Sequence, residues 1–401
     1  MIKIFQFADL HLDSPFASQS VTKAAAARQR LRELFCRMIK YARDGEYDLV
    51  LIPGDLYEDG YLTEETMRIV VSELATLACP VFISPGNHDP YTRSSLYKCA
   101  KFSENVHIFE GSKLTRIDLP DIGVDVYGYA FTSPSLPENL IANRRVSDTG
   151  IVNILCAHTD VLSPTSNYAP TTYADIEAAG FTYAALGHLH NAPEIYRSSC
   201  AAAYSGFAEG RGFDELGKGH ALSVTIFDTG EVKTVEADRI SFSTHSYEIR
   251  TLDVSGAEDD ASVLGKIRSL ISAAEYGSET SLRILLTGTV APAYRPNVAF
   301  LERAGRAELD MLEVRDETLP LLGGELDADI TLRGEVYRYL KDKMTSGTED
   351  ERETASLALR IALAALEDRD IALFMPPEEA TVTGVAANEI GERSETQNAD
   401  N

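Results

Sequence analysis

The sequence lacks the features of a secreted or membrane-embedded protein. Its 401 residues include only five cysteines, an odd number, and no pair of them is spaced as C-x-x-C. This argues against a disulfide framework or a zinc ribbon and favours a reducing cytoplasm. The start, MIKIFQFADL, lacks the basic residues and cleavage site of a signal peptide. No apolar run approaches the ~18 residues of a membrane span, so we expect a cytoplasmic protein with no membrane partner.

Basic residues are also scarce. The chain has 37 Lys and Arg against 62 Asp and Glu, which gives a formal net charge of −25. This balance argues against a protein that grips nucleic acid through a large basic face. Bound cations could still supply positive charge locally. The alternative is that the excess of acid only keeps the protein soluble.

Short apolar runs alternate with helical patterns along residues 1–240. We expect strands at 1–8, 48–53, 81–84, 124–131, 151–157, 183–187 and 221–227, and helices at 31–42 and 64–78. The β-α-β-α-β order at the start predicts parallel strands with right-handed crossovers. The fold class is therefore α/β, with one or two mixed sheets flanked by helices in layers.

Three further segments follow the domain at 1–240. Residues 241–322 predict a small α/β accessory domain, with strands at 246–254 and 282–288 around a helix at 260–274. Residues 323–372 predict a helical segment, with amphipathic helices at 330–344 and 350–367. Residues 373–401 predict a disordered acidic tail. The apolar stripes of the two helices, which either pack in their own hairpin or bind a partner, include Val336, Leu340, Leu357, Ile361, Leu363 and Leu366.

Five polar clusters lie at or just past the carboxyl ends of apolar strand-like runs. They are Asp9-Leu10-His11, Gly54-Asp55, Gly86-Asn87-His88-Asp89, Ala157-His158 and Gly187-His188-Leu189-His190. Loops at the carboxyl edge of an open α/β sheet converge on one crevice, so these clusters are expected to meet in space. The glycines suit tight turns and close backbone approach there, although a turn role alone would also explain each one.

The residue types in these clusters suit a metal centre. Carboxylates, imidazoles and an amide oxygen favour Mn²⁺, Fe²⁺ or Zn²⁺, and burying such groups together without a metal is costly. The candidate ligands are Asp9, His11, Asp55, Asn87, His158, His188 and His190. Five of the eight histidines fall in the clusters, although any single one could be a structural residue. The others, His107, His220 and His245, are expected to be structural or surface residues.

The ordered motifs DLH, GD, GNHD, AHTD and GHLH resemble the calcineurin-like metallophosphoesterase superfamily. The segments ADLHLDSPF, GDLYEDG, SPGNHDP and AEGRGFDELGKGH further resemble its SbcD/YhaO-like DNA repair exonuclease branch. One segment departs from that branch. Tyr204-Ser205-Gly206-Phe207 stands where the branch has a turn similar to Y-P-G-S.

The resemblance implies a layered metallophosphoesterase sandwich that holds two divalent metal ions, with Mn²⁺ favoured. It assigns Asp9, His11 and His190 to one metal, Asn87, His158 and His188 to the other, and Asp55 to both. It also implies that His88 assists the leaving group of an in-line hydrolysis. Asp89 either orients His88 or is a turn residue. Arg211 either contacts a substrate phosphate or forms an ion pair that packs domains together. Residues 57–59 either shape the groove or are solvated loop residues.

Three functions compete at this point. The first is a metal-dependent DNA exonuclease or endonuclease of DNA repair, working with a coiled-coil SMC-like ATPase that the helical segment would bind. The second is a phosphodiesterase or phosphatase for a small nucleotide-like substrate, because substrate choice depends on the surrounding loops. The third is a non-catalytic scaffold, which would have no physical need for seven metal-binding groups. The oligomeric state, with a homodimer as one option, stays open.

Overall fold

The computed structural model describes residues 1–366 except 18, 231, 292–293 and 321–323. The chain divides into two compact units. The first contains Met1–Ile249, Gly277–Arg283 and Glu308–Met311, and the second contains Arg250–Tyr276, Ile284–Ala307 and the residues from Leu312 onward. The acidic tail expected at 373–401 lies outside the described residues. The expected domain limits at 240, 322 and 372 remain predictions.

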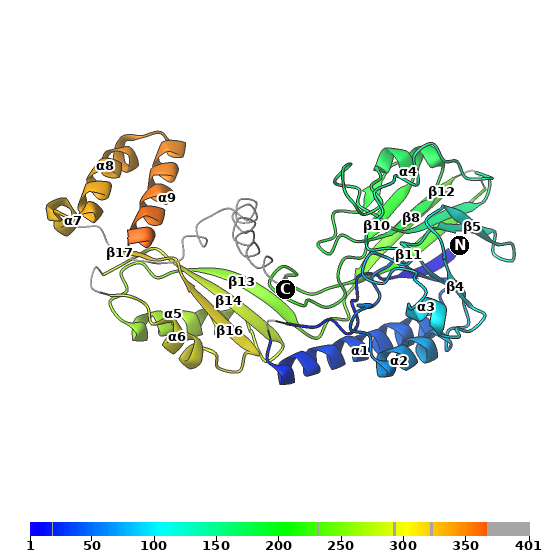
Figure 1. Cartoon of the computed structure of the whole chain (residues 1–401), viewed down its shortest axis with the longest axis horizontal. Helices are drawn as coiled ribbons and strands as arrows, with labels where there is room; N and C mark the ends of the chain where they lie inside the picture. Colours follow the sequence, from blue (N-terminus) through cyan, green and yellow to red (C-terminus); the bar gives the residue numbers. More distant parts are fainter. Residues whose placement is uncertain (18, 231, 292–293, 321–323, 367–401) are drawn as a thin grey trace, which may run out of the picture. The chain divides into compact units, whose positions relative to one another are not determined.

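The first unit contains two six-stranded sheets (Figure 1). The first sheet has the order β12 (Lys233–Ile240), β11 (Ala221–Asp228), β1 (Ile2–Gln6), β2 (Leu49–Ile52), β3 (Val81–Ile83) and β4 (Val106–Ile108). The second has the order β5 (Thr115–Leu119), β6 (Val124–Gly128), β7 (Val152–His158), β8 (Tyr183–Gly187), β10 (Ala201–Tyr204) and β9 (Tyr196–Arg197). Strands β1 to β4 pair in parallel, whereas β11 is antiparallel to β1 and β12. The predicted parallel start and mixed sheets are confirmed.

Side-chain alternation along the strands explains why the sheets stack. In β1, Ile2 and Ile4 belong to an apolar cluster that also contains Val126 and Ile154 of the second sheet. Phe5, from the same strand, belongs to a different cluster that contains the buried face of a long helix. One face of the first sheet therefore packs on the second sheet and the other face packs on helices.

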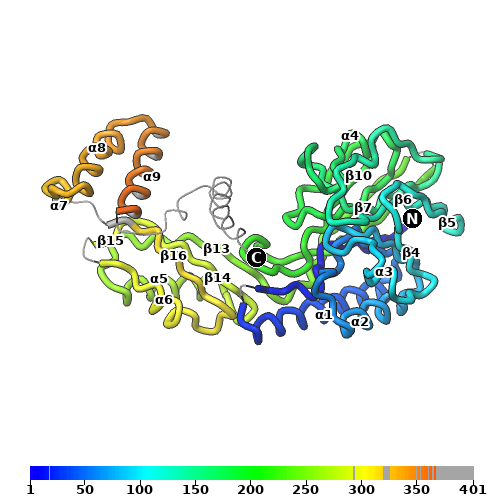
Figure 2. The backbone as a smooth tube through the Cα atoms, viewed as in Figure 1, coloured from blue at the N-terminus to red at the C-terminus, as the bar shows by residue number. Residues whose placement is uncertain are grey.

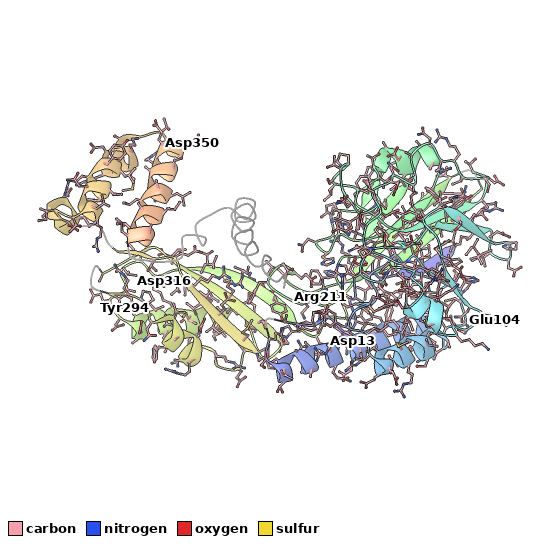
Figure 3. The ribbon with its side chains drawn as sticks, viewed as in Figure 1. Asp13, Glu104, Arg211, Tyr294, Asp316 and Asp350 are labelled. Carbon is pink, nitrogen blue, oxygen red and sulfur yellow. The ribbon has the colours of Figure 1, made fainter. Side chains whose placement is uncertain are left out.

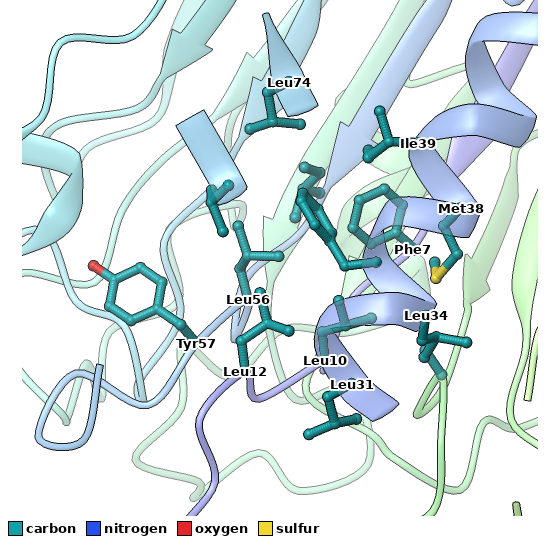
Figure 4. Close-up of a cluster of buried hydrophobic side chains, with 14 of the residues drawn as sticks. Phe7, Leu10, Leu12, Leu31, Leu34, Met38, Ile39, Leu56, Tyr57 and Leu74 are labelled. Atoms are coloured by element: carbon teal, nitrogen blue, oxygen red, sulfur yellow. The ribbon is translucent and has the colours of Figure 1, made fainter. Parts of the chain in front are cut away.

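The helices form the two outer layers of this sandwich. Helix α1 (Val21–Asp44) and helix α2 (Glu64–Leu74) cover the first sheet (Figures 1 and 2), and their apolar side chains meet Phe7 in the core shown in Figure 4. Helix α3 (Leu96–Cys99) is a short addition. Helix α4 (Tyr173–Ala179) packs on the outer face of the second sheet through Ile176. The result is an α/β/β/α sandwich, which confirms the predicted layered fold class.

The second unit is smaller. A three-stranded sheet of β13 (Ser246–Asp253), β14 (Thr280–Thr287) and β16 (Met311–Asp316) has strands that begin in the first unit and end in the second. The second unit also contains the pair β15 (Thr289–Val290) and β17 (Leu319–Pro320), and the helices α5 (Asp260–Ala273), α6 (Val298–Gly305), α7 (Gly324–Ala328), α8 (Leu332–Ser346) and α9 (Glu349–Leu366). Helices α8 and α9 pack against each other through Tyr337 and Leu363. Leu357 and Leu366, which the sequence placed in the apolar stripe, are exposed.

Two general properties bear on the setting of the protein. All five cysteines lie in the described residues and none forms a disulfide. Within the described ranges, no helix combines the length and the apolar character that a membrane span requires.

Gly187 provides a test of how tightly the two sheets approach each other. It is the last residue of β8, and a Cβ atom added there would lie 1.9 Å from the carbonyl oxygen of Pro53, which follows β2. We expect Gly187→Ala to lower the free energy of unfolding by about 1–3 kcal/mol, the usual cost of overpacking. Urea denaturation measures this change. Gly60→Ala is the control, because no atom lies within 4 Å of its added Cβ. Equal midpoints for the two variants would contradict the packing described here.

Candidate metal centre

The loops that follow five strands carry the predicted site residues. Asp9 and His11 follow β1, Asp55 follows β2, Asn87 and His88 follow β3, His158 ends β7, and His188 and His190 follow β8. The first two loops are joined by backbone hydrogen bonds from Asp9 N–H to Gly54 O (3.2 Å) and from His11 N–H to Asp55 O (3.0 Å). The carboxyl ends of strands from both sheets therefore meet at one edge, as predicted.

The backbone of these loops is unusual. Asp9, His11, Asp55 and His188 have φ angles of 52°, 46°, 51° and 109°, in the left-handed region that non-glycine residues rarely adopt. Each such residue costs of order 1–3 kcal/mol and persists only where its surroundings enforce it. Here the backbone N–H of His188 donates to the Asp9 carboxylate at 3.1 Å. Four residues whose side chains form the site therefore have a strained backbone.

Asp89 holds the loop after β3 in place. Its carboxylate accepts hydrogen bonds from the backbone N–H groups of Gly86 (2.7 Å), Asp55 (3.1 Å) and Leu56 (2.7 Å), and from the hydroxyl of Tyr97 (2.6 Å). Gly86 must lack a side chain, because an added Cβ would lie 2.2 Å from an Asp55 carboxylate oxygen. Asp89 was expected either to orient His88 or to be a turn residue, and the contacts of its carboxylate are those of a turn residue.

One group of predicted ligands gathers around His11. Its Nε2 lies 3.1 Å from Nε2 of His190 and 3.7 Å from Oδ2 of Asp55. Ligand atoms of Asp9, His11, Asp55 and His190 all lie within 4.8 Å of one another. Two carboxylates and two imidazoles therefore face one small space.

A second group gathers around His158. Its Nε2 lies 2.8 Å from Oδ1 of Asn87 and 3.5 Å from Oδ2 of Asp55. The ring of His188 lies 5.1 Å from the His158 ring, measured between centroids. Asp55 is thus shared by the two groups. The structure brings all seven predicted ligand residues together.

The electrostatics of these groups suit a cation. Burial raises the pKa of Asp9 to about 8 and lowers the pKa values of His11 and His158 to about 4. The imidazoles are therefore neutral, which is the form that binds metals. Nε2 of the neutral His11 faces Nε2 of His190 at 3.1 Å, and at most one hydrogen fits between the two atoms. Burial opposes protonation of His190, but the hydrogen bond to Glu215 and the charge of Asp9 outweigh it and raise the pKa of His190. Divalent ions would use these lone pairs and favour the charged form of Asp9, so the donor set fits them.

His88 stands beside this set, and Glu58 is its partner. The two carboxylate oxygens of Glu58 lie 2.7 Å from Nδ1 of His11 and 2.9 Å from Nδ1 of His88. The hydrogen bond to Glu58 raises the pKa of His88 to about 9, while burial opposes this rise. The expectation of solvated loop residues at 57–59 is wrong for Tyr57, which is buried, and for Glu58, whose side chain is only 15% exposed.

Arg211 and Glu215 support His190 from outside the set. Oε1 of the buried Glu215 lies 2.8 Å from Nδ1 of His190 and 2.6 Å from Nη2 of Arg211 (labelled in Figure 3). Burial raises the pKa of Glu215, but hydrogen bonds from His190 and Arg211 outweigh it and bring the pKa to about 2. Arg211 also donates to the Ser14 hydroxyl at 3.2 Å. Arg211 therefore forms an ion pair with Glu215, but this ion pair supports His190 and does not pack domains together.

The α/β/β/α sandwich and its shared-carboxylate donor set fit a phosphoesterase domain that holds divalent metal ions. The family of calcineurin-like phosphoesterases matches residues 2–192, and the chain carries a domain of this family. The family predicted from the sequence is confirmed.

Curated relatives extend this likeness. The uncharacterized metallophosphoesterase YhaO of Bacillus subtilis is 26% identical over 70% of this chain and 71% of its own length. The SbcD component of the nuclease SbcCD from Staphylococcus epidermidis is 24% identical over 46% of this chain and 57% of its own length. Both support the predicted SbcD/YhaO-like branch.

Two other proteins are similar to parts of this chain. A Coxiella burnetii protein named as a probable cyclic nucleotide phosphodiesterase is 34% identical over 88 residues, which are 22% of this chain and 32% of that protein. A dimetal phosphatase of known structure from Danio rerio is 12% identical, with a TM-score of 0.36, over 60% of this chain and 99% of its own.

Glu215→Gln tests the support of His190. A carboxylate behind a metal-binding imidazole fixes its tautomer and raises its basicity, and its loss costs about 10–100-fold in metal affinity. We expect this loss in competition titrations of Mn²⁺ against a fluorescent chelator. Asp214→Asn, the same change at the exposed neighbouring residue, is the control. Equal Mn²⁺ affinity in both variants would contradict a supporting role for Glu215.

Proposed function

We propose that this protein is a metal-dependent phosphodiesterase that cleaves DNA. The observation that carries the proposal is the position of Asp55, whose Oδ2 lies 3.7 Å from His11 Nε2 and 3.5 Å from His158 Nε2. A carboxylate shared by two sets of donors suits two neighbouring divalent ions. When bound, such ions stabilise the attacking and leaving oxygens of an in-line displacement.

The proposed ligand sets follow the two groups of side chains. Asp9, His11 and His190 would hold one ion, Asn87, His158 and His188 the other, and Asp55 both. The donors do not discriminate strongly among Mn²⁺, Fe²⁺ and Zn²⁺, and we propose Mn²⁺ because the family resemblance favours it.

His88 is proposed to donate a proton to the leaving oxygen. Its side chain is 43% exposed, so a substrate can reach it. With a pKa of about 9, it carries its proton at neutral pH. Glu58 would hold the ring in place through Nδ1 and leave Nε2 to act on the substrate. Asp89 would contribute indirectly by fixing the loop that carries His88.

A coiled-coil ATPase partner is proposed for the helical segment. Leu332, Tyr339 and Leu366 of α8 and α9 are 63%, 71% and 43% exposed, which provides apolar surface for a partner helix. A relative named as a subunit of a nuclease supports this proposal. The formal charge of −25 also suits a subunit that relies on its partner to grip DNA. The five free cysteines suit work in the cytoplasm.

Hydrolysis of a small nucleotide is the second candidate. It is favoured by the likeness to the protein named as a probable cyclic nucleotide phosphodiesterase, although that likeness covers 22% of this chain. The same centre would serve both substrates, because substrate choice lies in the surrounding surface.

Two variants separate metal binding from proton transfer. His88→Ala should keep the metal content but lower turnover of a labelled oligonucleotide, whose leaving alkoxide needs a proton, by about 10²–10⁴-fold, the usual contribution of a general acid. Asp55→Asn should lose both metal and turnover, since Asp55 belongs to both donor groups. Metal analysis of the purified proteins and initial rates provide the measurements. Loss of metal from His88→Ala would show that its assigned role is wrong.

The substrate class is tested directly. With Mn²⁺, we expect the wild-type protein to cleave 5′-labelled single- or double-stranded DNA, to lose this activity in EDTA, and to regain it when excess Mn²⁺ is added. Cyclic nucleotides are the competing substrates. Full turnover in excess chelator would refute the metal centre. A kcat/KM higher for cyclic nucleotides than for DNA would favour the second candidate.

A further inference from the structure

A hollow of about 240 Å³ adjoins the metal centre on the side of His190. It is formed by the loop after β8, the turn after β10, the segment before β11 and strand β12. The lining residues that matter here are His190, Phe207, Lys218, His220 and Arg239. Because His190 belongs both to this hollow and to the ligand set, whatever occupies the hollow lies next to the centre.

The charge of the lining is opposite to that of the protein. Lys218 and Arg239 are cationic, and none of the lining residues is acidic. Burial and the charge of Arg239 lower the pKa of His220, so this side chain is neutral at neutral pH. The whole chain carries 62 acidic and only 37 basic residues. This local excess of cations beside a phosphoester-cleaving centre suits an anionic group of the substrate.

Lys218 and Arg239 both have hydrogen-bond donors from which no protein group among the described residues accepts. Lys218 is exposed, and its ammonium group makes neither a hydrogen bond nor an ion pair within the part of the chain that the structure describes. Arg239 donates from Nη2 to the carbonyl oxygen of Pro193 at 2.8 Å, which leaves most of its five donors free. Arg suits phosphate because its planar donors match the phosphate oxygens.

The backbone fixes the hollow relative to the centre. The N–H of Phe207 donates to the carbonyl oxygen of His190 at 3.1 Å, and the N–H of His220 donates to the carbonyl oxygen of Phe207 at 2.9 Å. A movement of the centre would therefore carry the hollow with it. Phe207 is also one of the two residues, with Ser205, at which the turn departs from the branch pattern, and it places an apolar ring in the wall.

The size of the hollow argues for part of a long ligand. Pockets that enclose a whole small molecule usually measure about 300–1,000 Å³, and this one is smaller. A phosphate with its sugar needs less room than a complete ligand. An apolar wall beside cations also matches the alternation of sugar and phosphate along a nucleic-acid strand.

We propose that this hollow binds a second phosphate of a DNA strand, next to the phosphodiester that is cleaved, through Lys218 and Arg239. The inference rests on the proposed function and deepens it, because it makes a polynucleotide the preferred substrate. The phosphate contacts would set the register of the strand on the centre and would not read its sequence.

The test compares two charge-matched double variants on two substrates. Lys218→Gln with Arg239→Gln removes two charges from the hollow, whereas Arg68→Gln with Lys101→Gln removes two from a separate apolar groove beside α2. With Mn²⁺, we expect the first pair to lower kcat/KM on a labelled single-stranded oligonucleotide by about 10-fold or more, since each lost phosphate contact weakens binding. Its loss on bis(p-nitrophenyl) phosphate should be at least about fivefold smaller, because that diester has no second phosphate. The control pair should leave kcat/KM for the oligonucleotide unchanged.

Salt dependence and conservative variants distinguish a loss of phosphate contacts from a misfolded variant. The slope of log(kcat/KM) against log[salt] should become less steep by about 1.4 for the double variant, that is about 0.7 for each contact to a single strand. Lys218→Arg and Arg239→Lys, which keep the charge, should retain most of the activity, and Lys218→Gln alone should show half of the slope change.

Each remaining outcome has a distinct meaning. Equal losses on both substrates, or an unchanged salt slope, would overturn the hollow as a phosphate site. Wild-type protein that hydrolyses the small diester but not DNA would do the same and leave a small-molecule hydrolase. Wild-type protein that hydrolyses neither would refute the proposed function. In that case, the affinity of wild type and of the double variant for the labelled oligonucleotide, measured by fluorescence anisotropy, would show whether the hollow binds DNA.

Discussion

Burial of the Asp55 carboxylate between two sets of imidazoles is the interaction on which the rest of the site depends. Asp55 is 1% exposed and His11 and His158 are fully buried, so water cannot stabilise their polar atoms. Uncompensated burial of such groups costs several kcal/mol each. Hydrogen bonds compensate part of this cost, and the facing lone pairs need cations for the remainder. The strained backbone and the surrounding carboxylates follow from this one requirement.

The fold meets the requirement through rigid strand ends. Alternating apolar side chains fix β1 and β2 between the inter-sheet core and α1, so the loops that follow have little freedom. Within those loops, buried carboxylates accept backbone hydrogen bonds. Asp89 does so after β3, and Asp13 accepts from the N–H of Thr63 at 2.8 Å while pairing with Arg32 at 2.9 Å. The left-handed conformations at Asp9, His11 and Asp55 persist because these contacts determine the path of the chain.

The sequence predicted the parts of the fold that have a strong pattern. Strands β2 and β3 are continuous apolar runs and β1 is mostly apolar, and all three were found, as was the convergence of their carboxyl ends. Strand β12 (KTVEADRI) was missed because it is mostly polar and half-exposed, and β10 (AAAY) because alanine favours helices rather than strands. Pairing with β11 and β8 overrides these local preferences.

The site shows the same division. Its seven candidate ligands stand beside strand ends and could be chosen from sequence, whereas Glu58 was named only as a possible groove residue and Glu215 was not chosen. Each is an acid among 62, and their significance comes from contacts with His88 and His190 across 30 and 25 residues of chain. The spacing of Glu58, three residues after Asp55 in a loop that turns back on the centre, was the one available signal. His220 was expected to be structural or a surface residue, and only the fold shows that it borders the centre.

The proposed function also resolves the conflict between an acidic chain and an anionic substrate. At physiological salt, charges separated by more than about 8 Å are largely screened, so the formal charge of −25 has less influence than the groups within reach of the substrate. Near His190, Arg211 is paired with Glu215, and the lining of the hollow adds the cations Lys218 and Arg239 but no acidic residue. Binding therefore depends on where the few cations lie rather than on how many there are. A centre of this kind discriminates weakly on its own, because every phosphodiester presents the same reacting atoms. Under the proposed function, the adjoining surface would be the part of the molecule that selects a strand over a small nucleotide.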